Sequence, residues 1–149
     1  MWLGGADCPG LNRLAFGAIL MQPVGSLEDA YGELRKQLKA FKPGRPDPAT
    51  TCDFFYAINY RVGLSAVSDM ALQLNRLIKW SVSNVRLMSL EPSGLRAAAS
   101  QAQQRAVTLD VDINTSPDFD GLLPSDRLVD IWDELVDLGE EIAAKGEPE

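Results

Sequence analysis

The chain has 149 residues, of which 46% are apolar, 23% charged and 7% aromatic. This length suits one domain and excludes a large multidomain enzyme. The apolar fraction is too high for a disordered chain. Histidine is absent, which excludes catalytic triads and dyads with a histidine base and zinc sites with imidazole ligands.

Charge is distributed unevenly along the chain. The formal net charge is −7, from 14 basic and 21 acidic residues. Residues 1–107 hold 12 basic and 8 acidic residues, whereas residues 108–149 hold 2 basic and 13 acidic ones. An end this acidic disfavours binding to the phosphates of nucleic acid and favours a basic protein surface.

The two cysteines, Cys8 and Cys52, form no close pair and no metal-ligand pattern. Isolated thiols of this kind are typical of a reduced cytosolic protein. The first residues lack the basic region of a signal peptide, and no apolar run approaches the roughly 18 residues that span a bilayer. We therefore expect a cytoplasmic protein with no membrane partner and no cofactor.

The first half of the chain predicts a strand, a helix and a second strand. Residues 1–12 are a lightly ordered lead-in, and the apolar run that follows Arg13 and closes at Pro23 is typical of a strand. Ser26, with Asp29 three residues later, predicts the start of a helix. The expected apolar face of this helix is Leu27, Ala30, Tyr31, Leu34, Leu38 and Phe41. Residues 52–62 alternate between apolar and polar positions, which predicts the clearest strand in the sequence.

The second half predicts two further strands and a final helix. Residues 68–82 fit either a helix beginning at Ser68 or a strand, and the β-branched and aromatic content of their second half favours the strand. Residues 95–104 are a linker or an exposed helix, and residues 106–114 alternate as a strand with one wet face. The last helix begins at Pro124-Ser125-Asp126 and buries Leu128, Ile131, Trp132, Leu135, Leu138 and Ile142.

These elements predict an α+β domain over residues 13–145, followed by a short tail at 146–149. The expected fold is a mainly antiparallel sheet of about four strands with two main helices packed on one face, because that arrangement buries every apolar stripe.

Five stretches, in this order, resemble the C-terminal portion of a sporadically distributed family of uncharacterised prokaryotic proteins. They are RLAFGA (13–18), DFFYAINY (53–60), LNRLIKWSV (74–82), LDVDINT (109–115) and DELVDLGEEI (133–142). The family has no established activity, and its sporadic occurrence implies an association with mobile or defence genes. Typical members carry an N-terminal portion that this chain lacks, so the resemblance implies a short form, or a partner or second copy that fills its role.

Two aspartates on one face of the strand 106–114 are the best candidates for chemistry. Asp110 and Asp112, with Asp53 as a third ligand, have the oxygen donors that Mg²⁺ requires in nucleases and nucleotidyltransferases. The simpler interpretation is the solvated face of a half-buried strand. A metal-dependent nuclease or nucleotidyltransferase is therefore the alternative function, and an enzyme is disfavoured.

Two other patterns raise the question of nucleic-acid binding. The aromatic residues Phe54, Tyr56 and Tyr60 share a strand face, as in base-stacking platforms, but they also share it with aliphatic residues, which is typical of a core. A polar patch contains Asn59, Arg61, Asn75, Arg76 and Lys79, and a basic strip follows the first helix at Arg35, Lys36, Lys39, Lys42 and Arg45. The net negative charge favours solvated faces over phosphate binding.

Acidic residues recur along the last helix at spacings of four, three, four and four. This acidic stripe consists of Asp126, Asp130, Asp133, Asp137 and Glu141. It lies opposite the apolar stripe and adjoins Asp118 and Asp120 in the preceding loop. The sequence therefore predicts a non-enzymatic interaction protein that binds a basic protein surface or self-associates. In either case the acidic stripe would contact the basic residues, either of a partner protein or of the basic half of a second copy in a homodimer. A solvated face that only maintains solubility is the other interpretation.

Overall fold

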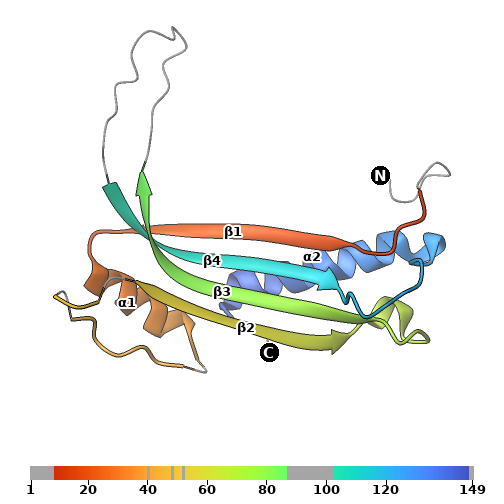
Figure 1. The fold of residues 1–149 in the computed structure, drawn as a ribbon, viewed down its shortest axis with the longest axis horizontal. Coiled ribbons are helices and arrows are strands. Elements are labelled where there is room, and N and C mark those ends of the chain that lie inside the picture. Colours follow the sequence, from red (N-terminus) through yellow and green to blue (C-terminus); the bar gives the residue numbers. More distant parts are fainter. Residues whose placement is uncertain (1–8, 40, 48, 52, 87–102, 148–149) are drawn as a thin grey trace, which may run out of the picture. The chain divides into compact units, whose positions relative to one another are not determined.

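The computed structural model describes residues 9–39, 41–47, 49–51, 53–86 and 103–147. These residues form four strands and two helices (Figure 1). The elements in chain order are β1 (Ala15–Val24), α1 (Leu27–Gln37), β2 (Phe54–Gly63), β3 (Gln73–Arg86), β4 (Gln103–Thr115) and α2 (Leu128–Lys145). Short 3-10 turns, η2 (Ser65–Val67) and η3 (Ser125–Arg127), precede β3 and α2. The predicted α+β class is confirmed.

The four strands form one antiparallel sheet in the order β1-β4-β3-β2. Consecutive strands β2, β3 and β4 are neighbours, which is the usual arrangement of antiparallel strands. The first strand instead pairs with the last one, and the chain passes through α1 before it enters β2. This connection places β1 and β2 at the two edges of the sheet.

The chain divides into two compact units, and every strand contributes to both. The first unit comprises Met1–Leu20, Ala57–Lys79 and Leu109–Glu149, and the second comprises Met21–Tyr56 and Trp80–Thr108. Each unit contains one of the helices and is described by itself below.

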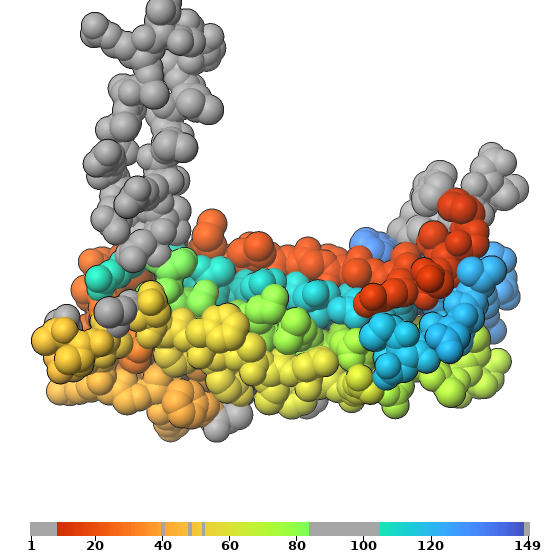
Figure 2. Space-filling model, in the orientation of Figure 1, coloured from red at the N-terminus to blue at the C-terminus, as the bar shows by residue number. Residues whose placement is uncertain are grey.

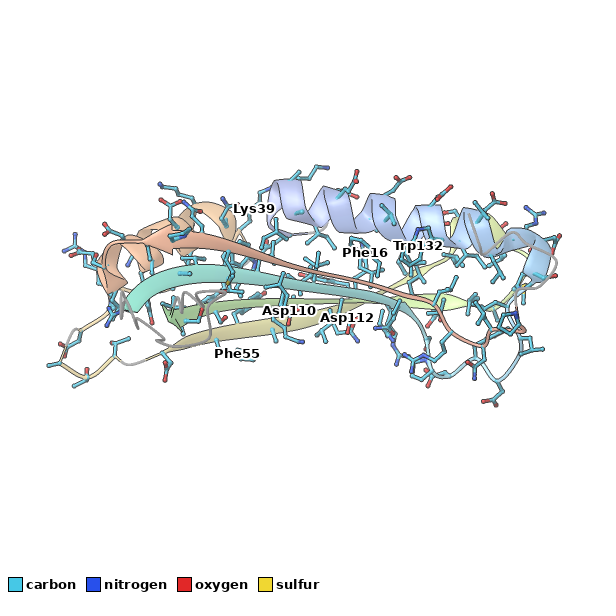
Figure 3. The ribbon with its side chains drawn as sticks, turned by 90° about the horizontal axis from the view of Figure 1, so that it is seen from above. Phe16, Lys39, Phe55, Asp110, Asp112 and Trp132 are labelled. Atoms are coloured by element: carbon cyan, nitrogen blue, oxygen red, sulfur yellow. The ribbon has the colours of Figure 1, made fainter. Side chains whose placement is uncertain are left out.

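In the first unit α2 packs on the apolar face of its strands. Its buried positions Leu128, Ile131, Leu135 and Ile142 recur at helical spacing. The apolar strand side chains that are also buried in this unit are Leu74, Ile78, Leu109, Val111 and Ile113. The ring of Phe16 in β1 meets Trp132 edge to face, with ring centroids 6.2 Å apart (Figure 3). The predicted apolar stripe of the last helix is therefore the contact surface of α2.

In the second unit α1 begins as the sequence predicts and ends earlier. The Ser26 hydroxyl accepts a hydrogen bond from the Asp29 amide (3.1 Å) and donates one to the Asp29 carboxylate (2.7 Å), which is a helix N-cap. The helix ends at Gln37, so the expectation that Phe41 lies on its apolar face is wrong. Phe41 instead stacks on Tyr56 of β2 (centroids 6.1 Å apart). The guanidinium of Arg35 bonds the carbonyls of Pro43 and Gly44 (2.9 and 2.7 Å) and so holds the chain after the helix.

The ambiguous segment 68–82 contains the start of β3, as its β-branched content favours. Leu72, Leu74, Ile78, Trp80 and Val82 are buried at alternate positions. The strand β4 begins at Gln103, so Gln103 and Gln104 belong to it and not to the predicted linker. The rest of that linker, and both cysteines, lie outside the described residues. In the described part of the chain, neither helix has the length and apolar character needed to cross a bilayer.

Candidate functional site

The two aspartates of β4 lie on the face of the sheet that points away from α2. Val107, Leu109, Val111 and Ile113 are buried at alternate positions of the same strand, and Figure 3 shows Asp110 and Asp112 on the side opposite the helix. The Asp110 carboxylate pairs with the ammonium of Lys79 in β3 (3.1 Å). The Asp112 carboxylate accepts a hydrogen bond from the Asn114 amide (2.9 Å). Both carboxylates therefore have protein partners.

A polar network crosses the strands on this face. The Asn59 amide of β2 donates to Asn75 of β3 (3.4 Å), and Asn75 donates to Asn114 of β4 (3.1 Å). The carbonyl oxygen of Asn114 also accepts from Arg13 (3.2 Å). Figure 2 views the molecule from this side, where all four strands reach the surface. Cross-strand bonds of this kind fix the pairing register.

A metal-dependent nuclease or nucleotidyltransferase would require a third carboxylate near Asp110 and Asp112. Asp53 lies just before β2 and is exposed. Among the described residues, no three aspartate, glutamate or cysteine side chains are grouped so that they could hold a metal ion. Lys79 occupies the position beside Asp110 and supplies the positive charge that a metal ion would bring there. The arrangement is that of a stabilised sheet surface.

The predicted polar patch and aromatic platform separate onto the two faces of the sheet. Asn75 and Lys79 belong to the network face, but Arg76 alternates to the helix side, where its guanidinium lies over the Tyr60 ring (5.8 Å). The expectation that Arg76 joins the polar patch is therefore wrong. Phe54 is covered by Tyr31 (ring centroids 5.5 Å apart), so the aromatic face of β2 contacts protein, as a core would.

The acidic stripe of α2 is partly neutralised by the two basic residues of this end of the chain. Arg127 approaches Asp126 and Asp130 at 3.8 and 3.9 Å. Lys145 pairs with Glu141 at 3.0 Å. These pairs lie at the two ends of the helix and are exposed, so each contributes little to stability.

The centre of the stripe has no such compensation. Asp133 and Asp137 are exposed, as is Glu140 beside them. In the described part of the chain, no cation pairs with any of these three carboxylates. In the preceding loop, Asp118 pairs with Arg61 of β2 (3.0 Å), whereas Asp120 is exposed. The uncompensated negative charge therefore lies at Asp120, Asp133, Asp137 and Glu140.

Glu134 belongs to the same acidic segment but has a structural role that the sequence does not indicate. Its two carboxylate oxygens accept the backbone N–H groups of Ser65 (2.9 Å) and Ala66 (2.8 Å) in η2. These amides begin a 3-10 turn and would otherwise have no intrahelical acceptor. Glu134 therefore joins α2 to the connection between β2 and β3.

We expect Glu134→Ala to lower the free energy of unfolding by about 1 kcal/mol, because it leaves two backbone amides, one exposed and one partly buried, without their acceptor. Asp133→Ala, which removes the neighbouring exposed carboxylate, should change stability by less than about 0.5 kcal/mol. Urea denaturation followed by circular dichroism measures both values. Equal effects of the two substitutions would contradict the role assigned to Glu134.

No family model, no curated protein and no solved structure matches this chain.

Proposed function

We propose that this chain is a non-enzymatic interaction protein of the prokaryotic cytoplasm that binds a basic surface of another protein through the outer face of α2. The observation that carries the proposal is the row of exposed carboxylates Asp133, Asp137 and Glu140, which lie about one helical turn apart with no cation beside them in the described chain. The buried stripe on the opposite side of α2 fixes this row outward.

Electrostatics supports a basic partner. Like charges three or four positions apart on a helix lower its stability by roughly 0.2–0.5 kcal/mol per pair. Lysine or arginine side chains of a partner would remove this repulsion and raise the association rate. Nucleic acid has the wrong charge for such a surface. The partner is therefore a protein with a lysine- or arginine-rich face.

Charge reversal tests the proposal. The variant carries Asp130→Lys, Asp133→Lys and Asp137→Lys, all at exposed positions. A matched control makes the same change in net charge with Glu28→Lys, Asp53→Lys and Asp69→Lys, which are exposed elsewhere. The immobilised full chain is incubated with lysate of the native host at about 50 mM and about 300 mM salt, and the retained proteins are identified and quantified.

We expect the parent and the control to retain the same basic proteins at low salt and to release them at high salt. The α2 variant should retain them about tenfold less, because it loses several exposed charge pairs and adds repulsion. Unchanged retention by the α2 variant at low salt would refute the proposal and leave the stripe as a solvated face. Circular dichroism of each variant checks that the fold is intact.

A further inference from the structure

The edge strand β1 exposes apolar side chains on both of its faces. Ile19, Leu20 and Met21 are 68%, 39% and 58% exposed. No charged residue occurs anywhere from Leu14 to Leu27. Long, uncharged, apolar edge strands are rare in isolated proteins, because they pair with strands of other chains. The opposite edge strand, β2, differs: it carries Arg61, which pairs with Asp118.

The backbone of β1 also has groups available for pairing. The Leu14 carbonyl accepts the amide of Thr115, the last residue of β4 (3.0 Å). In a regular antiparallel strand the N–H and C=O groups of one residue point to the same side, and those of the next residue point to the opposite side. The backbone groups of the even-numbered residues therefore point to β4, and those of the odd-numbered residues point away from it. Gly17, Ile19 and Met21 therefore direct their backbone groups to the open edge. Pro23 has no N–H to offer there, which limits the pairing segment to the residues before it.

We propose that β1 pairs in antiparallel orientation with β1 of a second copy of this chain. A two-fold axis perpendicular to the sheet passes midway between Ile19 and its equivalent in the partner, so that these two residues lie opposite each other. The surface concerned differs from the outer face of α2, so this inference is independent of the proposed function.

Two features of β1 identify a second copy as the occupant. The order of side-chain sizes complements itself in this register: Met21 lies opposite Gly17 of the partner, and Leu20 lies opposite its Ala18. A large residue thus meets a small one on each face of the joined sheet. The second feature is the absence of charge: no charged residue occurs from Leu14 to Leu27, so the pairing of two copies brings no like charges together within the contact. The net charge of −7 on each copy opposes association only at longer range.

The first experiment measures the oligomeric state of the full chain by sedimentation equilibrium. We expect the parent to form a dimer and Ile19→Lys/Met21→Lys to be monomeric, with a dissociation constant raised by about a hundredfold or more, since pairing would place four lysines together. Phe55→Lys is the matched control, because Phe55 is an equally exposed apolar residue (70%) of the other edge strand; it should remain dimeric. A monomeric parent, or a dimer that the double variant retains, would overturn the proposal.

Salt distinguishes this contact from the one proposed for α2. The β1 contact contains no charged residue, so raising salt from about 50 mM to about 300 mM screens the repulsion between copies and should strengthen the dimer. Binding of a basic protein should weaken over the same range. A dimer that dissociates as salt rises would overturn the pairing of β1, whatever the result of partner capture.

Cysteine cross-linking tests the register. In a Cys8→Ser/Cys52→Ser background, Ile19→Cys should form a disulfide between chains on mild oxidation, because directly opposed Cα atoms lie about 4.5–5.5 Å apart. Met21→Cys should not, since its equivalent lies four strand positions away, about 13 Å. Preferential cross-linking of Met21→Cys, or of Leu20→Cys, would overturn the axis at Ile19.

Discussion

Replacing Val111 by aspartate is expected to abolish folding of the unit that contains α2. Val111 is fully buried in β4, with Leu109 and Ile113 on either side of it on the same face. The substitution removes a buried apolar side chain that contributes about 1.5–3 kcal/mol. It also places a carboxyl group at a fully buried position flanked by apolar side chains, at a further cost of several kcal/mol. The sum approaches the whole stability of a typical domain, about 5–15 kcal/mol.

The matched control is Asp112→Asn, one position further along the same strand. The Asp112 Oδ1 atom accepts from the Asn114 amide, and the asparagine side chain retains an oxygen acceptor at this position. We expect a change of less than about 1 kcal/mol in the free energy of unfolding. Far-ultraviolet circular dichroism and urea denaturation separate the two variants. Similar destabilisation by both would show that the two faces of β4 are assigned incorrectly.

The second large effect is expected at Gly139 in α2. A Cβ atom added at Gly139 would lie 2.6 Å from Cδ1 of Phe16 and even closer to Cε1 of that ring. The ring is held between α2 and the sheet by its edge-to-face contact with Trp132. Overpacking of this kind typically costs about 1–3 kcal/mol. We therefore expect Gly139→Ala to lower the melting temperature, although alanine is the better helix former by about 1 kcal/mol.

Gly32 in α1 provides the comparison. Apart from the helix's own backbone and the two neighbouring residues, no atom lies within 4 Å of a Cβ added there. Only helix propensity therefore changes, and Gly32→Ala should stabilise the protein by about 0.5–1 kcal/mol. Thermal denaturation of both variants gives the opposite signs directly. If Gly139→Ala stabilised the protein as much as Gly32→Ala, the close packing of Phe16 on α2 would be wrong.

Local periodicity was sufficient for most of the fold. Alternation of apolar and polar residues identified β4 and the correct side of Asp110, because a strand places successive side chains on opposite faces. Ser26 identified the start of α1 through its own hydrogen bond to a residue three positions away. These features depend on neighbours in sequence, and the sequence contains them in full.

The acidic surface required the tertiary structure for its interpretation. The spacing of acidic residues predicted a stripe on the last helix, but spacing does not distinguish the carboxylates that have a partner from those that have none. Asp118 is neutralised by Arg61, a residue 57 positions away, and Glu134 accepts amides 68 and 69 positions away. The charge of Asp118 is offset by a cation, and the carboxylate oxygens of Glu134 are already occupied by backbone N–H groups. In the described part of this acidic segment, the carboxylates that remain without a partner are Asp120, Asp133, Asp137 and Glu140.

By itself, the sequence determined the α+β class, the faces of the strands and helices, and the separation of charge along the chain, because these follow from residue types at short periods. Tertiary structure alone decided which strands are neighbours and therefore that β1 lies at an edge. Strand order depends on hydrogen bonds between segments far apart in sequence, and no local pattern specifies it. In the centre of a sheet an uncharged apolar segment is a buried strand with a neighbour on each side. At the edge, the same segment is a surface that can pair with another chain.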